Sequence, residues 1–226
     1  MTQQQTALPA YRTLAGNGSA ELVEKKSRFL AFACPCTSEE EARAVLEAQG
    51  KAYWDASHVC YAYIIGKPGA TERFSDAGEP SGTAGRPILD VLRGAGVTDT
   101  LIYVVRYFGG TLLGTGGLVR AYGGAAKAAL QTAPVIDRVP AAELIIRTDY
   151  TDVGRILYLL GQEGIAQSGA DYGADVTLTV LPPDTQRERL IKQLTEATAG
   201  RVRLEDGPQR YLDREVPALR QEKDSL

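Results

Sequence analysis

The sequence is poor in the residues that metal centres and disulfide scaffolds need. Its 226 residues include three cysteines and one histidine. An odd cysteine count in a chain of this length argues against a disulfide framework. Cys34, Cys36 and His58 carry atoms that bind metals, but structural zinc sites use four ligands at regular spacings, and those spacings are missing here. We therefore expect buried thiols, no metal site and no cofactor.

Long apolar runs and a strong net charge are also missing. No run is long enough to cross a bilayer, and the first residues lack the basic and apolar segments of a secretory signal. We therefore expect a cytoplasmic protein with no membrane partner. The net charge of −3 does not suggest a broad nucleic-acid binder. The charge is uneven, because residues 1–138 carry +1 and residues 139–226 carry −4.

Glycine, by contrast, is abundant, and two glycine-rich stretches carry most of the information. The first is DAGEPSGTAG, residues 76–85, and the second is RYFGGTLLGTGGLVRAY, residues 106–122. Glycine weakens helices and strands because it has more backbone entropy to lose and no side chain to pack. So many glycines beside Arg, Glu and Tyr indicate that the backbone closely approaches a ligand, a phosphate or another part of the chain.

The second stretch lies between a predicted strand and a predicted helix, where α/β proteins place phosphate-binding turns. A Walker A loop needs Lys-[Ser/Thr] after its last glycine. Gly109 and Gly114 have the right spacing, but Thr115-Gly116 follows them. The dinucleotide pattern needs a third glycine where this chain has Val119. Nucleotide hydrolysis and dinucleotide binding are therefore not expected.

Two roles stay open for the arginines that flank this stretch. Arg106 and Arg120 are each able to hold a phosphate through two nitrogens. Arg106 is equally able to pair with Glu79 or Asp76 and lock the two stretches together. Phe108 and Tyr122 are the better candidates for exposed rings that stack on bases. The residues expected to contact a nucleic acid or another anion are Arg86, Arg106, Gly109, Gly110, Gly116, Gly117, Arg120 and Tyr122.

An acid–base set is the competing hypothesis for the first stretch. His58, Asp76 and Glu79 are the residue types that general acid–base catalysis uses. A hydrolase also needs a nucleophile or a metal, and no Gly-x-Ser-x-Gly elbow is present. A lone histidine on an apolar strand is more often a hydrogen-bonded structural residue, so we do not expect catalysis.

Periodicity predicts two domains, 1–138 and 139–226, joined by a linker at 134–140. The first 20 residues are polar and expected to fray. The first domain should contain strands within 21–34, 57–65, 73–75 and 101–107, and helices at 38–50, from 87 and at 118–132. The second should contain strands at 142–148, 165–172, 174–181 and 202–211, and helices at 149–161 and from 182 to about 200. The resulting order, β-α-β-β-α-β, is that of ferredoxin-like domains.

Long strings in the first half resemble the IMPACT/YigZ family. They are Ser57-His58, residues 79–85, residues 106–110 and residues 113–122. The resemblance covers residues 20–130, and the later segment resembles the second domain of bacterial members. It implies two α+β domains, the first like domain IV of elongation factor G and the second like its ferredoxin-like domain V. One position departs: the family string has two acidic residues before Gly-Glu-Pro, whereas Ala77 follows Asp76 here.

The resemblance also suggests a function, since eukaryotic relatives are linked to the control of translation. We therefore expect a non-enzymatic protein that binds RNA, the ribosome or a translation-associated protein. The first alternative is a hydrolase that uses His58, Asp76 and Glu79. The second is a purely protein-binding regulatory module, whose acidic second domain meets a basic partner.

Overall fold

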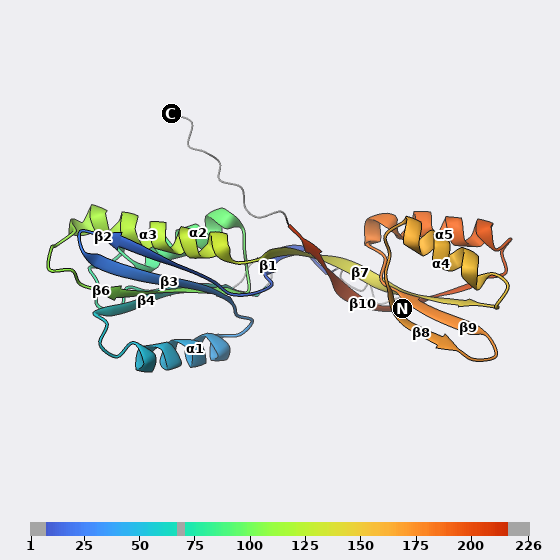
Figure 1. Cartoon of the computed structure of the whole chain (residues 1–226), viewed down its shortest axis with the longest axis horizontal. Helices are drawn as coiled ribbons and strands as arrows, with labels where there is room; N and C mark the ends of the chain where they lie inside the picture. Colours follow the sequence, from blue (N-terminus) through green and yellow to red (C-terminus); the bar gives the residue numbers. More distant parts are fainter. Residues whose placement is uncertain (1–7, 67–70, 217–226) are drawn as a thin grey trace, which may run out of the picture. The chain divides into compact units, whose positions relative to one another are not determined.

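The chain folds into two α+β units (Figure 1). The computed structural model describes residues 8–66 and 71–216. The N-terminal unit comprises Tyr11–Asp137 and the described residues after Asp213, and the C-terminal unit comprises Arg138–Asp213 and the described residues before Tyr11. Each unit therefore includes a short segment from the opposite end of the sequence.

A five-stranded antiparallel sheet forms the middle of the N-terminal unit. Its strand order is β2-β3-β6-β4-β5. The strands are β2 (Gly18–Glu24), β3 (Ser27–Pro35), β4 (His58–Ile65), β5 (Thr71–Ser75) and β6 (Thr100–Tyr107). β6 is central and buried on both faces over nearly its whole length, as its continuous run of apolar residues predicts.

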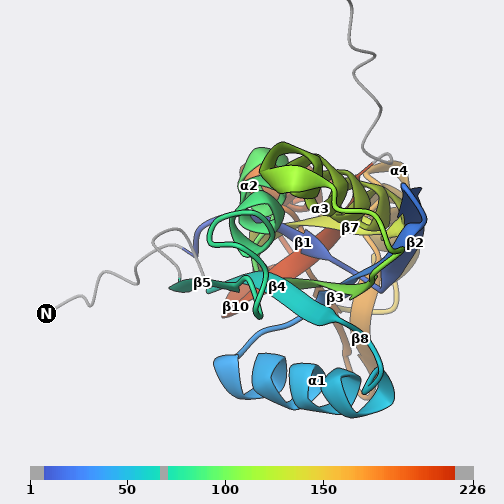
Figure 2. The same ribbon diagram turned by 90° about the vertical axis from the view of Figure 1, so that its left-hand side faces the viewer.

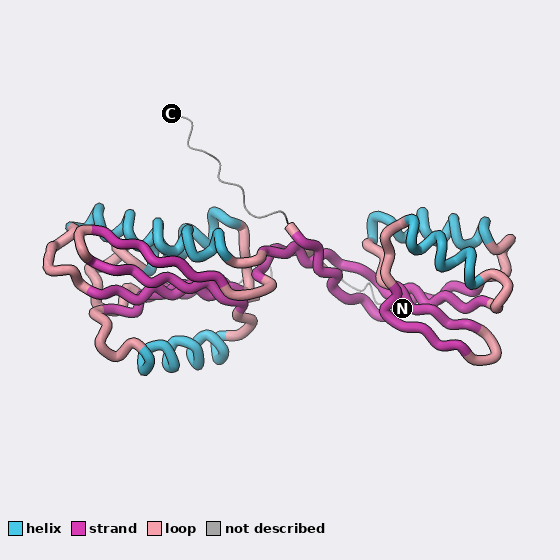
Figure 3. The backbone as a smooth tube through the Cα atoms, in the orientation of Figure 1, coloured by secondary structure: helices cyan, strands magenta, loops and turns pink. Residues whose placement is uncertain are grey.

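Helices cover both faces of this sheet, α2 (Gly85–Ala95) and α3 (Gly114–Thr132) on one and α1 (Glu39–Ala52) on the other (Figures 2 and 3). Ser38 begins α1, and its hydroxyl accepts a hydrogen bond from the Glu41 amide at 3.1 Å, which is half of the predicted capping box. Leu101, Tyr103 and Val105 of β6 face the α1 side and form its core.

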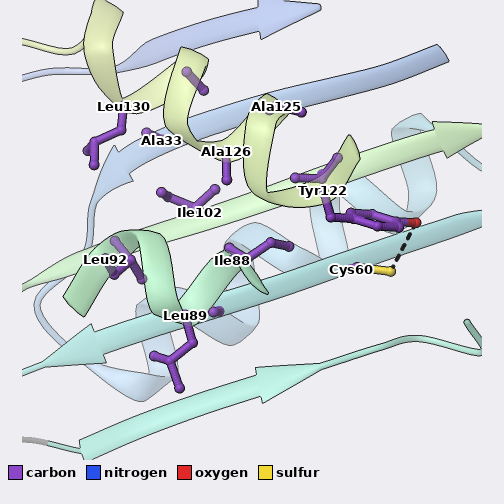
Figure 4. Close-up of a cluster of buried hydrophobic side chains, with 14 of the residues drawn as sticks. Ala33, Cys60, Ile88, Leu89, Leu92, Ile102, Tyr122, Ala125, Ala126 and Leu130 are labelled. Atoms are coloured by element: carbon purple, nitrogen blue, oxygen red, sulfur yellow. Dashed lines mark hydrogen bonds between the residues drawn. The ribbon is translucent and has the colours of Figure 1, made fainter. Parts of the chain in front are cut away.

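The larger core lies under α2 and α3 (Figure 4). Its members include Ile88, Leu89 and Leu92 from α2, Tyr122, Ala125 and Ala126 from α3, and Ala33 and Ile102 from the sheet. Small alanines let the helix approach the strands closely. At Gly18 of β2 a Cβ atom would lie 2.3 Å from the Ala129 carbonyl oxygen, so this position needs glycine.

The C-terminal unit has the predicted β-α-β-β-α-β order. Its elements are β7 (Val135–Thr148), α4 (Val153–Gln162), β8 (Gln167–Tyr172), β9 (Val176–Val180), α5 (Asp184–Ala197) and β10 (Arg203–Glu215). In the sheet β7 pairs with β9 and β9 with β8, while β10 also pairs with β7. Leu144, Ile146 and Leu178 belong to the core shared with the helices, and Leu144 and Ile146 lie on the same face of β7 because alternate residues of a strand share a face.

Two expectations about the chain's path are wrong. The division between the units falls within residues 134–140, between Asp137 and Arg138, but this segment is not an irregular linker, because β7 begins at Val135 and runs on without a break. The N-terminal segment is not frayed throughout, since Tyr11–Leu14 forms β1 beside the start of β7. There the Arg12 guanidinium binds Asp137 at 2.7 Å, and the Ala15 amide donates to the Pro134 carbonyl at 2.8 Å.

The second glycine-rich stretch is also divided differently from the prediction. α3 begins at Gly114, four residues before the expected Leu118. Gly116 and Gly117 therefore lie in the first helical turn, whereas Gly109 and Gly110 lie in the loop between β6 and α3. Among the helices of the described residues, none is both long and apolar enough to span a membrane.

Candidate functional site

Asp76 organises the first glycine-rich stretch. Its carboxylate accepts hydrogen bonds from the amides of Gly82 at 2.8 Å, Ala84 at 3.0 Å and Gly85 at 2.8 Å. Ala84, the N-cap of α2, has no side chain that caps the helix, so Asp76 takes that role from outside it. Burial by itself raises the pKa of Asp76, but the three amide donors outweigh it and lower the pKa below its ordinary value. Asp76 is thus occupied as a structural cap.

Glu79 and Arg106 form a buried ion pair that ties the two glycine-rich stretches together. The Arg106 Nη1 atom lies 2.5 Å from Glu79 Oε1, and the two side chains are 6% and 3% exposed. The Tyr122 hydroxyl donates to the same oxygen at 2.7 Å, and the Cys60 thiol donates to the Tyr122 oxygen at 3.4 Å (Figure 4). Of the two roles considered for Arg106, pairing with Glu79 is the one found in the structure.

Tyr122 is fully buried in the core beneath α3. The prediction that its ring is exposed for stacking is therefore wrong. The ring packs edge-on against Phe29 at 5.1 Å, and its hydroxyl is needed to satisfy the buried Glu79 carboxylate. Phe108, the other predicted stacking residue, is 50% exposed, so its ring is available at the surface.

His58 lies beside Glu79 and takes no part in the capping of α2 by Asp76. Strand pairing sets His58 of β4 opposite Arg106 of β6. The ring Nδ1 atom is 2.9 Å from the Ala77 carbonyl oxygen, and Nε2 is 3.9 Å from Glu79 Oε1. The structure therefore brings two of the three residues of the acid–base hypothesis together, and the third holds the α2 N-terminus.

These residues open onto a cleft of about 570 Å³ within the N-terminal unit. His58, Glu79 and Arg106 supply its polar lining, and Phe108, Leu112 and Leu118 supply apolar lining. Gly114 and Thr115, where α3 begins, form another part of the wall. Polar groups next to an apolar lining are typical of ligand sites, and the volume lies in their usual range.

The N-terminus of α3 has no capping side chain. Leu113 is its N-cap residue and makes no side-chain hydrogen bond to the helix. Throughout the residues with assigned structure, no hydrogen bond from another segment reaches the first-turn amides of Gly114, Thr115 and Gly116. Free amides and the helix dipole make such a terminus attractive to anions. The Arg120 guanidinium lies nearby, because its Nη1 atom is 3.6 Å from where a Cβ on Gly116 would stand.

The predicted cations differ in what they contact. Arg86 is exposed and pairs with Asp90 one turn along α2 at 3.0 Å, whereas Arg106 is buried. Arg120 is exposed and has no ion-pair partner within residues 8–66 and 71–216. Gly117 lies on the same turn of α3 and lines a second hollow with Arg120. Gly110 is exposed in the loop, at a φ of +82° that favours glycine.

The sequence analysis missed two lysines at this end of the unit. Lys25 and Lys26 form the turn between β2 and β3, with φ angles of +47° and +68°. Lys25 lines a hollow of about 250 Å³ with Arg120 and Glu24. The loop after β6 packs directly on the turn, since a Cβ at Gly109 would lie 2.0 Å from the Lys26 carbonyl carbon. The sequence signal that could have found these residues is a Lys-Lys pair between two alternating segments.

The three cysteines are free thiols. Burial raises the pKa of Cys34 and Cys60 to about 12 and that of Cys36 to about 11. Such thiols are poor nucleophiles and poor metal ligands at neutral pH. Over the described ranges, the His, Cys, Asp and Glu side chains form no group of three or more that suits a metal ion.

Comparisons with known proteins place the whole chain. Residues 25–130 match the Impact N-terminal domain, and residues 146–201 match a domain of unknown function, DUF1949. The IMPACT family member YvyE of Bacillus subtilis is 33% identical over 95% of this chain and 99% of its own length. YigZ of Escherichia coli is 38% identical over 80% of this chain and 89% of its own length.

One solved structure supports this relationship. A crystal structure of a hypothetical protein is 35% identical, with a TM-score of 0.57, and the match covers 87% of this chain and 97% of that one. A structure described as the two-domain translational regulator Yih1 is 26% identical, with a TM-score of 0.38 over 59% of this chain and 53% of that one. With relatives above 30% identity along most of its length, the chain belongs to the IMPACT family.

Proposed function

We propose that the protein binds single-stranded RNA, without catalysing a reaction, at the loop end of its N-terminal unit. The observation that carries the proposal is a group of cations without ion-pair partners in the described chain: Lys25, Lys26 and Arg120. We call these three residues the basic rim. They lie next to the exposed Phe108 loop and the uncapped start of α3.

The chemistry of the basic rim suits a single strand of nucleic acid. Exposed lysine and arginine side chains neutralise phosphates, and an exposed aromatic ring stacks on bases of any identity. Acidic groups nearby offset only part of the charge of the rim, since one carboxylate stands against its three cations. Glu24 is the acidic residue that lines the hollow with Lys25 and Arg120, while Glu79 pairs with Arg106 and Asp76 caps α2. The rim is therefore a local positive surface on a chain whose net charge is −3.

The same geometry argues against the hydrolase. Asp76 accepts three backbone hydrogen bonds, which leaves it poorly placed to take a proton from a substrate. Glu79 shares its Oε1 atom between Arg106 and Tyr122. The expected likeness of the N-terminal unit to domain IV of elongation factor G stays a prediction, and the RNA proposal does not depend on it.

Fluorescence anisotropy with a labelled single-stranded RNA across a salt series tests the proposal. Each phosphate contact on a single strand contributes about −0.7 to the slope of log K against log[salt]. We expect the triple variant Lys25→Gln, Lys26→Gln, Arg120→Gln to lose affinity and to have a slope shallower by about 2, if each cation contacts one phosphate.

The matched control removes the same charge from the α1 side of the sheet. Arg43→Gln, Lys51→Gln, Arg73→Gln changes three exposed cations of α1 and β5. This variant should keep the wild-type slope and most of the affinity. Equal losses in both triple variants, or no RNA binding by a folded wild-type protein, would overturn the proposal. Loss of a pulled-down partner after nuclease treatment would support RNA binding over the protein-binding alternative.

A further inference from the structure

We infer that the cleft beside the basic rim is a subsite for one nucleotide unit, with its phosphate at the N-terminus of α3 and its base against Phe108. The inference deepens the proposed RNA binding and rests on it for the identity of the ligand. It adds a defined pocket to what is otherwise a charged surface. Three features of the cleft carry it: the free helix terminus, the unpaired Nε atom of Arg106 and the arrangement of the polar and apolar lining.

The first feature is the positive end of α3. Gly114 and Thr115 line the cleft, and no side chain caps the helix there. Arg120 lies over the same turn without a carboxylate partner among the described residues. A cation at the N-terminus of a helix is unfavourable alone, because the helix dipole is positive at that end. The helix dipole favours a phosphate at these amides, and Arg120, which lines the neighbouring hollow with Leu113 and Gly117, adds its positive charge to this end of the helix.

The second feature is independent of the helix. Arg106 is 5% exposed and lines the cleft, yet its Nε atom has no hydrogen-bond partner in the part of the chain that the structure describes. Its pair with Glu79 uses Nη1. Buried donors of native proteins are nearly always hydrogen-bonded, so an unpaired guanidinium nitrogen beside a cleft indicates a missing ligand or water.

The third feature is the placing of an aromatic ring and a carboxylate along the same cleft. Phe108 lines the cleft with its ring half exposed, and the Arg106 guanidinium lies 5.7 Å from the ring centroid. The buried Glu79 carboxylate accepts from Arg106 and Tyr122 through Oε1, and Oε2 remains as an acceptor. A base on Phe108 would therefore meet an acceptor for an edge N–H, while its phosphate meets the donors at α3. A lining with donors for an anion and an acceptor for a base fits a nucleotide better than a simple anion.

Isothermal titration with adenosine 5′-monophosphate, adenosine and inorganic phosphate tests the subsite. The monophosphate should bind at least about tenfold more tightly than adenosine or phosphate alone, because the two ends add their contributions. Thr115 is exposed in the first turn of α3, so a carboxylate there occupies the positive end and repels the phosphate. Thr115→Asp should weaken monophosphate binding about tenfold without lowering the melting temperature. Thr115→Asn, the neutral control of the same shape, should bind within about twofold of wild type.

The outcomes separate this inference from the proposed function. Equal binding of the monophosphate by wild type and Thr115→Asp would overturn the subsite, as would phosphate binding as tight as that of the monophosphate. RNA affinity that depends on the basic rim, with no affinity for the monophosphate, would overturn the subsite and leave the proposed function standing. Monophosphate binding that responds to Thr115→Asp in a protein without RNA affinity would support the pocket and overturn the proposed function.

Discussion

Replacing Glu79 by glutamine should cost about 3–5 kcal/mol of the free energy of unfolding of the N-terminal unit. Glutamine has the same shape, so packing is kept and only the charge is lost. Arg106, 6% exposed, is then left as a buried cation without its counter-ion. The exposed pair Arg86–Asp90, whose side chains are more than half exposed, should be worth only about 0–1 kcal/mol when Arg86 is replaced by glutamine.

A double-mutant cycle isolates the pair. Glu79→Gln, Arg106→Met and the double variant are unfolded in urea, with hydrogen exchange of the β6 amides reporting on this unit alone, because a two-unit chain need not unfold in one transition. We expect the double variant to cost less than the sum of the single variants by about 2 kcal/mol, since Arg106→Met removes the cation that Glu79→Gln leaves unpaired. Additive effects within about 0.5 kcal/mol would refute the reasoning, because uncoupled residues behave that way.

Three further predictions concern the same unit. Because folding lowers the pKa of Asp76, the ionised carboxylate stabilises the fold at pH values above the pKa of the unfolded chain, and this stabilisation is lost as the pH falls through the pKa of the folded state. Asp76→Asn should therefore cost about 1–2 kcal/mol of the free energy of unfolding at pH 7. Urea titrations should show that the difference between the variant and the wild type shrinks below about pH 4. Gly109→Ala should lower the melting temperature sharply, because the new Cβ atom would collide with the Lys26 backbone. Gly116→Ala should stabilise α3 by about 0.5–1 kcal/mol, because glycine weakens a helix. Similar melting temperatures for the two variants would contradict the geometry. The Cys60 thiol, with its pKa raised by burial to about 12, should react with a maleimide at pH 8 only after unfolding, and equal labelling of the native protein would count against its burial.

Much of the fold was predictable because the chain's local patterns agree with their tertiary surroundings. The apolar run of β6 and the alanine-rich face of α3 mark elements that are buried in the structure as well. The path around β7 was not predictable from local pattern. Prolines at 134 and 140 favour a linker, whereas the strand depends on pairing with β1, more than a hundred residues earlier.

The meeting of the two glycine-rich stretches was predictable from the sequence, but the roles of their residues were not. The density of Arg, Glu, Tyr and Gly correctly indicated that the two stretches meet, and the pair of Glu79 with Arg106 joins them. No local signal shows that Asp76 caps a helix nine residues ahead, because the missing cap at Ala84 is visible only once α2 is placed. The lysines of the basic rim were missed because residues 21–34 suit a strand pair or one long bent strand, so the sequence did not fix the position of the turn.

The departure from the family string at Ala77 affects the conformation of the backbone and not the reactive groups of the site. Ala77 has a φ of +44°, in the left-handed region that favours glycine, asparagine and aspartate. Its amide donates to the Ser75 hydroxyl oxygen at 3.1 Å, and its carbonyl oxygen lies 2.9 Å from His58 Nδ1, so the turn is held by main-chain atoms whatever the side chain. An aspartate in relatives is thus explained by its tolerance of this conformation, and alanine here strains the turn while leaving the contacts of Glu79 and Arg106 intact. The absence of a carboxylate at position 77 therefore removes no contact from the proposed binding site.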